Sequence, residues 1–500
     1  MKTEKWLNYG LWIALVVYWV VFSWRTVYWI GNPFANEAFE WGSIDMMHCF
    51  IKGINPYSFD NFLEHAYAYG PLYSFVCSLF YPLVNGAIDS VVFCRLMTLF
   101  MTIGSGLFVA SIVLCKTGRN VLLAAIAFTL TFVTSFQTAP VTAFPPALAI
   151  LFISYICWSF SKSWGLNYSN LLVVAILSVL SFFVKSYFIM IIAPVGLYLL
   201  AIRQWKKTLF YAFAILLLGC VAVLTANYIA PTLLYIMVGT HAAVAGFSIV
   251  HLLKQWGVFF IFYFPLLLAL AIILYNRKRE AFQLVSPFYW IFIVVSAVCL
   301  CMIGGHTGAF MEYFWHLLLL PVTIAGTIAF HYMPRKYRIL LFPLLIWCSV
   351  YHLAFIQSCP DYRNEMVETS IEKLKKYDTI KMDNSYNLAQ PIDDFGYKHG
   401  MKELGYGHRE HVMHMLEVKD SPLFHNVHME AVKRMKAWKA KFESDMSNGI
   451  PDYVTYIEHP NVANLFTTLH IEHLYEPVDT VLIPVGRKTI YPVVFYKSKK

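Results

Sequence analysis

The sequence predicts a mainly α-helical protein that crosses a membrane about eleven times and carries a small α/β domain at its C-terminus. Two observations support this fold class. Of the 500 residues, 59% are hydrophobic and only 13% are charged, whereas soluble domains carry roughly a quarter charged residues. The charged residues are also unevenly placed. Most lie after residue 360 or in short clusters between apolar runs of about 17–25 residues, a length that spans a bilayer as a helix.

Short basic clusters between the apolar runs set the expected orientation. Because positive residues are enriched in cytoplasmic loops, we place all of these clusters on the cytoplasmic side. An even number of crossings must then separate successive clusters. The clusters lie near Lys5, Lys116 and Lys162 and at 203–207, 277–279 and 335–338. Spans are therefore expected at 8–30, 91–115, 121–138, 144–160, 168–186, 188–202, 208–229, 256–275, 286–304, 308–330 and 339–357.

This topology places the acidic segment 31–90 and the C-terminal tail outside the cytoplasm. Segment 71–84 is short for a span and is expected as a re-entrant or surface helix on the outer face. The predicted division is a transmembrane module of residues 1–358, which includes the first outer loop, and an extracytoplasmic domain of residues 359–500. Within that domain, helices are expected at 362–376 and 424–445, and strands at 452–457, 480–485 and 491–496.

The composition also narrows the partners and cofactors. The net charge of +9 does not indicate a nucleic-acid partner, because the basic excess lies in the short loops. The ten cysteines lie mostly within apolar runs and match neither a disulfide framework nor a zinc site. Histidines in the tail have H-x-x-H spacing without a further ligand. The sequence thus predicts no metal ligand and no certain cofactor, and it leaves a divalent metal open.

Ionisable residues near the expected outer ends of the helices are candidates for function, because charge at membrane depth is costly. They include Arg95, Lys185 and Glu312, while His306 lies in a short outer turn. Cations beside carboxylates at a lipid–water boundary suit a lipid phosphate and a group reacting next to it. The ordinary alternative is that the cations extend to the headgroups and that Glu312 pairs with one of them.

The first outer loop carries the acidic part of this set. If residues 37–52 form a helix, Glu37 and Glu40 lie one turn apart on nearly the same face. Gly53 then ends the helix before a turn. The ordinary alternative is an amphipathic surface helix whose acidic side chains are solvated.

The order of these motifs resembles a known family. Glu40 precedes a G-x-x-x-Y turn formed by Gly53 and Tyr57, and Tyr69 opens the sequence Y-G-P-L-Y. Arg95, Lys185 and the G-x-x-G-A-F-x-E-Y stretch at 305–313 follow in order. This arrangement resembles the C-type (GT-C) glycosyltransferases, integral-membrane enzymes that use polyprenyl-phosphate sugars. They include the lipid A aminoarabinose transferases and the protein O-mannosyltransferases. The chain departs from the family where Gly70 replaces a frequent proline and Glu312 a frequent asparagine.

The resemblance implies an inverting transfer of a sugar from a polyprenyl-phosphate carrier to an extracytoplasmic acceptor, in cell-envelope glycan or lipid modification. It implies a carboxylate as general base, with Glu40 the first choice and Glu37 the second. Arg95 and Lys185 would bind the donor phosphate. The substrate pocket would be lined by Tyr57, Tyr69, His306, Glu312 and Tyr313.

The implied partners are the lipid-linked donor, the acceptor and the bilayer, with no nucleic acid. The implied location is the bacterial cell membrane, with the N-terminus in the cytoplasm. Two other functions stay open at this point. One is a flippase or transporter of polyprenyl-linked glycans, although mid-membrane ionisable residues and inverted repeats are not evident. The other is an envelope-polymer polymerase or ligase.

Overall fold

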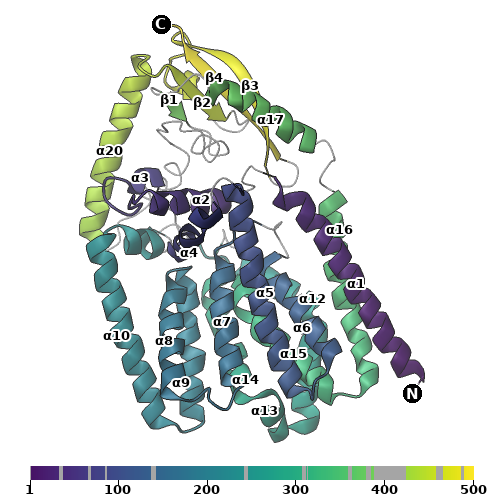
Figure 1. The fold of residues 1–500 in the computed structure, drawn as a ribbon. Helices are drawn as coiled ribbons and strands as arrows, with labels where there is room; N and C mark the ends of the chain where they lie inside the picture. The colour runs from purple at the N-terminus through teal and green to yellow at the C-terminus, as the bar shows by residue number, and fades with distance from the viewer. Residues whose placement is uncertain are drawn as a thin grey trace.

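The structure is a computed structural model, in which a bundle of long helices is capped at one end by short helices and a β-sheet (Figure 1). It describes residues 2–32, 38–65, 69–84, 87–136, 142–240, 246–306, 311, 313–357, 363–378, 385–387, 424–457, 465–485 and 489–500.

Most of the bundle helices begin and end within a few residues of the predicted spans. The helices Lys2–Ile30 and Ile249–Arg277 begin earlier than predicted, and Leu320–Tyr332 begins later. The bundle helices are α1 (Lys2–Ile30), α5 (Ser90–Lys116), α6 (Val121–Phe136), α7 (Pro146–Phe160), α8 (Tyr168–Phe182), α9 (Ile192–Ala201), α10 (Trp205–Ile229), α12 (Ile249–Arg277), α14 (Pro287–Ile303), α15 (Leu320–Tyr332) and α16 (Leu341–Gln357). Short 3₁₀ or π turns precede three of them: η2 (Ser186–Ile191), η4 (Phe314–Leu319) and η5 (Arg335–Leu340). Five segments of the described chain are long and apolar enough to cross a membrane alone: 5–27, 90–116, 205–229, 249–277 and 314–332. The mainly α, polytopic fold class is confirmed.

Local sequence explains where several of these helices begin. The Asp89 side chain accepts a hydrogen bond from the amide of Val91 at 2.8 Å and caps α5. Ser248 caps α12 in the same way by accepting from the amide of His251. Proline at the start of α14 lacks an N–H that would have no partner there.

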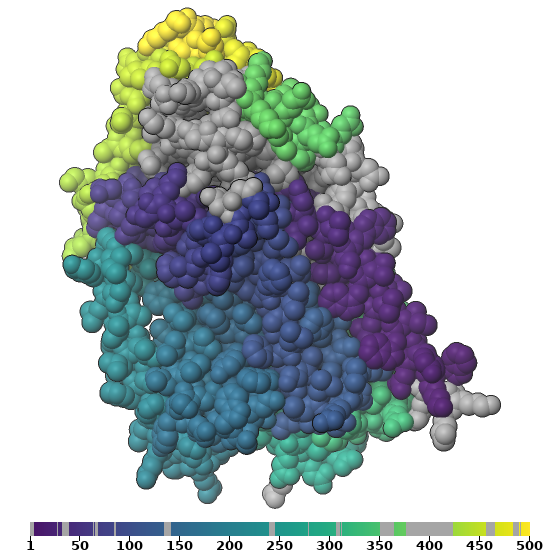
Figure 2. Space-filling view, in the orientation of Figure 1, coloured from purple at the N-terminus to yellow at the C-terminus, as the bar shows by residue number. Residues whose placement is uncertain are grey.

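The helices at the flanks of the bundle expose apolar side chains, as a lipid-facing surface requires. Helix α10 presents leucines outward along its length, and α1 forms the opposite flank (Figure 2). Helix α15 is the contrary case, because almost all its residues are buried in the centre of the bundle. This distribution, with apolar residues both inside and on the flanks, is that of an integral membrane protein.

The basic loops share the end of the bundle that lies away from the sheet. The Tyr332 hydroxyl donates to the carbonyl of Lys116 at 3.1 Å, so the loops after α5 and α15 meet. Arg338 lies 3.4 Å from the Asn8 side chain, near the start of α1. We call this the basic end, and the end beneath the sheet the capped end.

The first loop covers the capped end. It contains α2 (Ala38–Ile51), α3 (Phe62–His65), α4 (Leu72–Phe80) and η1 (Tyr81–Val84). Helices are thus present at both expected positions, 37–52 and 71–84. Gly53 follows α2 with a φ of +71°, which a residue with a side chain adopts only with strain, and the chain turns there.

The C-terminal region forms a four-stranded sheet with flanking helices. Its elements are α17 (Arg363–Asp378), β1 (Ser385–Asn387), α20 (His425–Ser447), β2 (Tyr453–Ile457), α21 (Leu465–Thr468), β3 (Tyr475–Val485) and β4 (Thr489–Ser498). The strand order is β1-β2-β4-β3, with β1 and β2 parallel and the other pairs antiparallel. The predicted helices and strands of this region are observed. The division at residue 358 stays a prediction.

Helix α20 joins this region to the capped end (Figures 1 and 2). The His428 ring lies 2.6 Å from the hydroxyl of Tyr235, which follows α10, and both residues are buried. Arg434 donates to the carbonyl of Phe59 at 3.0 Å and pairs with Asp60 in the first loop. Further along α20, Phe442 and Met446 belong to the core of the sheet region, so this helix links the sheet to the capped end.

Candidate functional site

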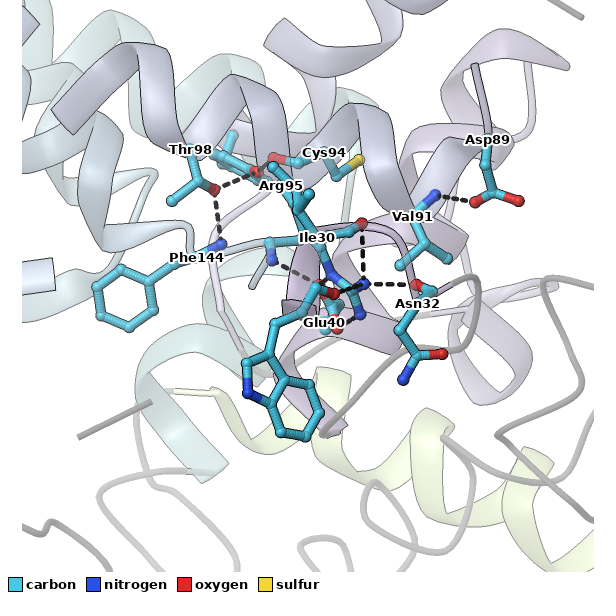
Figure 3. Close-up of polar contacts among 12 residues, drawn as sticks. Ile30, Asn32, Glu40, Asp89, Val91, Cys94, Arg95, Thr98 and Phe144 are labelled. Atoms are coloured by element: carbon cyan, nitrogen blue, oxygen red, sulfur yellow. Dashed lines mark hydrogen bonds and ion pairs between the residues drawn. The ribbon is translucent and has the colours of Figure 1, made fainter. Parts of the chain in front are cut away.

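A buried ion pair between Glu40 of the first loop and Arg95 of α5 lies at the capped end (Figure 3). Arg95, in the second turn of α5, donates from Nε to Oε1 and from Nη2 to Oε2 of Glu40, both at 2.8 Å. Both side chains are fully buried. Such a two-point pair fixes the guanidinium and the carboxylate in one plane and one register. It connects the first loop to the bundle.

The surroundings of the pair satisfy its remaining hydrogen-bonding groups. Nη1 of Arg95 donates to the carbonyls of Trp29 at 2.9 Å and Ile30 at 3.4 Å, and to that of Asn32. The amide of Ala143 donates to Glu40 Oε1 at 2.7 Å. The pair therefore ties together the end of α1, helix α2, helix α5 and the segment before α7. Removing one partner of such a pair costs about 3–5 kcal/mol, because a buried charge is left uncompensated.

A second hydrogen-bonded chain extends from this region toward α7. The Tyr73 hydroxyl donates to the carbonyl of Cys94 at 2.7 Å and lies 2.8 Å from Thr98 Oγ1. Thr98 in turn accepts from the amide of Phe144 at 2.9 Å. Burial raises the pKa of Tyr73, so its hydroxyl remains protonated.

Lys185 forms the centre of a second constellation. It lies between α8 and η2 in an extended conformation, with φ −158° and ψ 127°. Its Nζ is 4.1 Å from the ring centroid of Tyr69 and 5.4 Å from that of Tyr187. These distances are typical of cation–π contacts. Only 7% of the residue is exposed, so the charge is largely desolvated.

A close backbone contact brings Tyr69 and Lys185 together. The Gly70 amide donates to the carbonyl of Val184 at 3.2 Å, and the Leu72 amide to that of Phe183 at 3.1 Å. A Cβ at position 70 would lie 1.8 Å from the Phe183 oxygen. A proline there would also lack the donated N–H. The glycine that departs from the family pattern is therefore what this contact requires.

Aromatic residues from three distant parts of the chain complete this constellation. Tyr187 is hydrogen-bonded to Nδ1 of His316 in η4, and its ring lies edge-on to Tyr313 at 4.7 Å. Phe144 packs against His316, with their ring centroids 5.3 Å apart. We call Lys185, Tyr69, Tyr187, Tyr313 and His316 the Lys185 cluster. Phe144 connects it to the chain that begins at Tyr73.

Tyr57 fixes the position of Tyr69. Its hydroxyl donates to the Tyr69 carbonyl at 2.8 Å, and its own carbonyl accepts from the amide and hydroxyl of Thr232. Burial raises the pKa of Tyr57, so its hydroxyl stays a donor. Tyr57 thus belongs to the framework of the Lys185 cluster.

The structure brings together most of the residues that the sequence singled out. Glu40 and Arg95 contact each other, and Tyr57, Tyr69, Lys185 and Tyr313 belong to one constellation. The roles assigned to them stay predictions.

Three other predicted site residues are not among the contacts described above. His306 lies apart from these contacts, paired through its backbone with Phe247 ahead of α12. Glu37 and Glu312 lie outside the described residues.

The sequence interpretation missed two members of the Lys185 cluster. Neither His316 nor Tyr187 is among the residues that the sequence singled out. The two are 129 residues apart, and neither spacing nor composition connects them. One local signal in the sequence points to Tyr187: it lies two positions after Lys185.

The chemistry of the Lys185 cluster suits an anion next to an apolar ring or chain. A desolvated ammonium binds a phosphate oxygen more strongly than an exposed one does, because water competes less. The aromatic faces and hydroxyls beside it offer stacking and hydrogen bonds of the kind that sugar rings accept.

No protein-family model and no curated protein sequence matches the chain. Among solved structures, it is similar to ArnT from Cupriavidus metallidurans in the apo state. The TM-score is 0.58 and the identity 10%, over 99% of this chain and 98% of that chain. It is also similar to ArnT from the same organism bound to undecaprenyl phosphate, with a TM-score of 0.57 and 11% identity over 98% of both chains. The chain therefore has the fold of ArnT, an aminoarabinose transferase of the C-type class, and the predicted resemblance is confirmed for the fold.

Proposed function

We propose that this protein is a membrane glycosyltransferase that moves a sugar from a polyprenyl-phosphate carrier to an extracytoplasmic acceptor. The observation that carries the proposal is the Lys185 cluster, which offers a desolvated cation beside aromatic rings at the capped end of the bundle. The fold adds support, because one of the similar structures is ArnT bound to undecaprenyl phosphate.

In the proposed reaction the acceptor hydroxyl or amine attacks the anomeric carbon from the face opposite the phosphate. The bond from that carbon to the phosphate oxygen breaks, and polyprenyl phosphate leaves with the electron pair. Lys185 stabilises the charge that develops on the leaving oxygen. A carboxylate takes the acceptor's proton. Attack from the opposite face inverts the configuration at the anomeric carbon.

The buried ion pair guides the assignment of the base. A general base must come within hydrogen-bonding distance of the acceptor. Glu40, the first choice from the sequence, has both oxygens occupied by Arg95 and the Ala143 amide. We therefore assign proton abstraction to Glu37 and give Glu40 and Arg95 a positioning role. Phosphate binding is assigned chiefly to Lys185.

The test is incubation of the purified protein with a panel of polyprenyl-phosphate sugars, followed by detection of released polyprenyl phosphate. The wild-type protein should consume at least one donor. Glu37→Gln should reduce turnover by about 100-fold or more while donor binding is kept. Lys185→Gln should weaken donor binding. Glu280→Gln, at an exposed position on the basic end, is the control and should behave as wild type.

Two results would contradict parts of this account. Full turnover by Glu37→Gln, together with loss of turnover in a stably folded Glu40→Gln protein, would return the base role to Glu40. Movement of intact donor across a vesicle membrane without cleavage would favour a flippase and refute the transferase.

The proposal includes an orientation in the bacterial cell membrane, with the basic end in the cytoplasm and the capped end outside it. The support is that the basic loops lie together at one end of the bundle, as the positive-inside rule requires. Reporter fusions after residues 60 and 480 should be extracytoplasmic, and one after residue 279 cytoplasmic. Any reversal would remove the site from the side on which the acceptor is expected.

A further inference from the structure

Three potential metal ligands meet in the first loop, and none of them has a role in the proposed sugar transfer. Asp45 and Cys49 lie one turn apart on α2 and so share a face of that helix. His65 is the last residue of α3. A carboxylate oxygen, the thiol sulfur and an imidazole nitrogen of these three residues all lie within 4.8 Å of one another.

The loop backbone holds α3 against α2. After Gly53 the chain reverses, and the Ile54 amide donates back to the Cys49 carbonyl at 2.8 Å. The amide of Phe62 donates to the Ser58 carbonyl at 3.0 Å, which starts α3. The Phe62 side chain is fully buried beneath it. The position of His65 relative to α2 is therefore set by a folded turn.

The spacing suits a tetrahedral cation. Zinc–ligand bonds of about 2.0–2.3 Å give ligand–ligand distances of about 3.3–3.8 Å. Nδ1 of His65 lies 3.1 Å and 3.3 Å from the two Asp45 oxygens, close to that value. The Cys49 sulfur completes the set after an adjustment of at most about 1 Å.

The charges and the solvent accessibility of the three residues also suit a divalent cation. A carboxylate and a thiolate together balance a divalent cation, and imidazole is a neutral ligand. Cys49 is fully buried, whereas the Asp45 and His65 side chains are 17% and 25% exposed. A cation can thus enter from solvent, and a water can take the fourth position.

We propose that Asp45, Cys49 and His65 bind a thiophilic divalent cation, with Zn²⁺ the best match, and that the cation fastens α3 to α2. The site goes beyond the proposed function, because no step of the transfer uses it. The competing explanation is a hydrogen-bonded Asp45–His65 pair beside a cysteine that only packs. The two explanations differ in whether a cation binds and is contacted by the Cys49 sulfur.

The experiment uses the full-length protein in detergent, treated with chelator and titrated with Co²⁺ and then with Zn²⁺. One equivalent of Co²⁺ should bind and give a thiolate-to-cobalt charge-transfer absorption, and Zn²⁺ should displace it. Cys49→Ser should abolish that absorption, and His65→Asn should weaken binding at least tenfold. Cys77→Ser, which removes another buried thiol of the first loop, and His48→Asn, next to Cys49, are the controls and should bind as wild type.

The change in unfolding temperature on addition of Zn²⁺ is a second readout, and it does not require the variants to be equally stable. Zn²⁺ should raise the unfolding temperature of the wild-type protein and of both controls, but not that of Cys49→Ser. The proposal is overturned if the wild-type protein shows no sulfur–cobalt absorption. It is equally overturned if Cys49→Ser keeps that absorption. Because neither readout measures sugar transfer, failure of the metal-site proposal would not refute the proposed function. Failure of the proposed function would likewise not refute the metal site.

Discussion

The Glu40–Arg95 pair allows a prediction whose size follows from the structure. Arg95→Met removes the cation and leaves the Glu40 carboxylate fully buried without its charged partner. The expected loss of stability is about 3–5 kcal/mol. Glu40→Gln removes the opposite charge and should cost a similar amount. The double variant carries no buried charge at this place, so its loss should be smaller than the sum of the two by about 3 kcal/mol.

The assay is heat-induced unfolding in detergent, followed by intrinsic fluorescence for the wild-type protein, both single variants and the double variant. Arg277→Met is the matched control, because Arg277 forms an exposed ion pair with Glu280 at 3.3 Å and should change stability by less than about 1 kcal/mol. If Arg95→Met unfolds at the wild-type temperature, or if the two single effects simply add, the pair does not organise the capped end.

Three further predictions concern the contacts around the site. Gly70→Ala should lower the stability by at least about 2 kcal/mol and weaken donor binding, because the alanine Cβ would lie 1.8 Å from the Phe183 carbonyl oxygen. Unfolding and donor-binding measurements test the two effects. Wild-type stability and binding would contradict the close contact of Gly70 with Phe183. Tyr187→Phe removes the hydroxyl bonded to His316 and should cost about 1–3 kcal/mol, measured by unfolding. The hydrogen bond from Arg434 lowers the pKa of Glu430, so the contribution of this pair is present at neutral pH and lost as the pH falls through that lowered pKa. Unfolding midpoints measured from neutral to acid pH should therefore fall less steeply for Arg434→Gln than for the wild type, and an unchanged slope would refute this.

The spans were predictable because apolar length and basic loops are local properties of a membrane sequence. One departure from the predicted spans has a specific cause. Helix α8 ends at Phe182 and not at 186, because Lys185 adopts an extended conformation and the residues before it pair with the loop around Gly70. That pairing joins segments more than 100 residues apart, and no local pattern encodes it.

The candidate site was predictable as a list of residues but not as a set of contacts. Acidic and basic residues at the expected outer boundary identified Glu40, Arg95 and Lys185. The sequence could not show that Arg95 pairs with Glu40, because this depends on how α2 packs on α5. It also could not place His316 beside Tyr187, since a buried histidine has the same sequence signal whether it packs or bonds.

The most direct test of the central claim is the affinity of the purified protein for undecaprenyl phosphate, compared with that for undecaprenol, which lacks the phosphate. The wild-type protein should prefer the phosphate, and Lys185→Gln should lose about 10-fold or more of that preference, as removal of a charge-assisted hydrogen bond predicts. Equal affinity of the wild-type protein for the two lipids, or an unchanged preference in Lys185→Gln, would contradict a lipid-phosphate site at the Lys185 cluster.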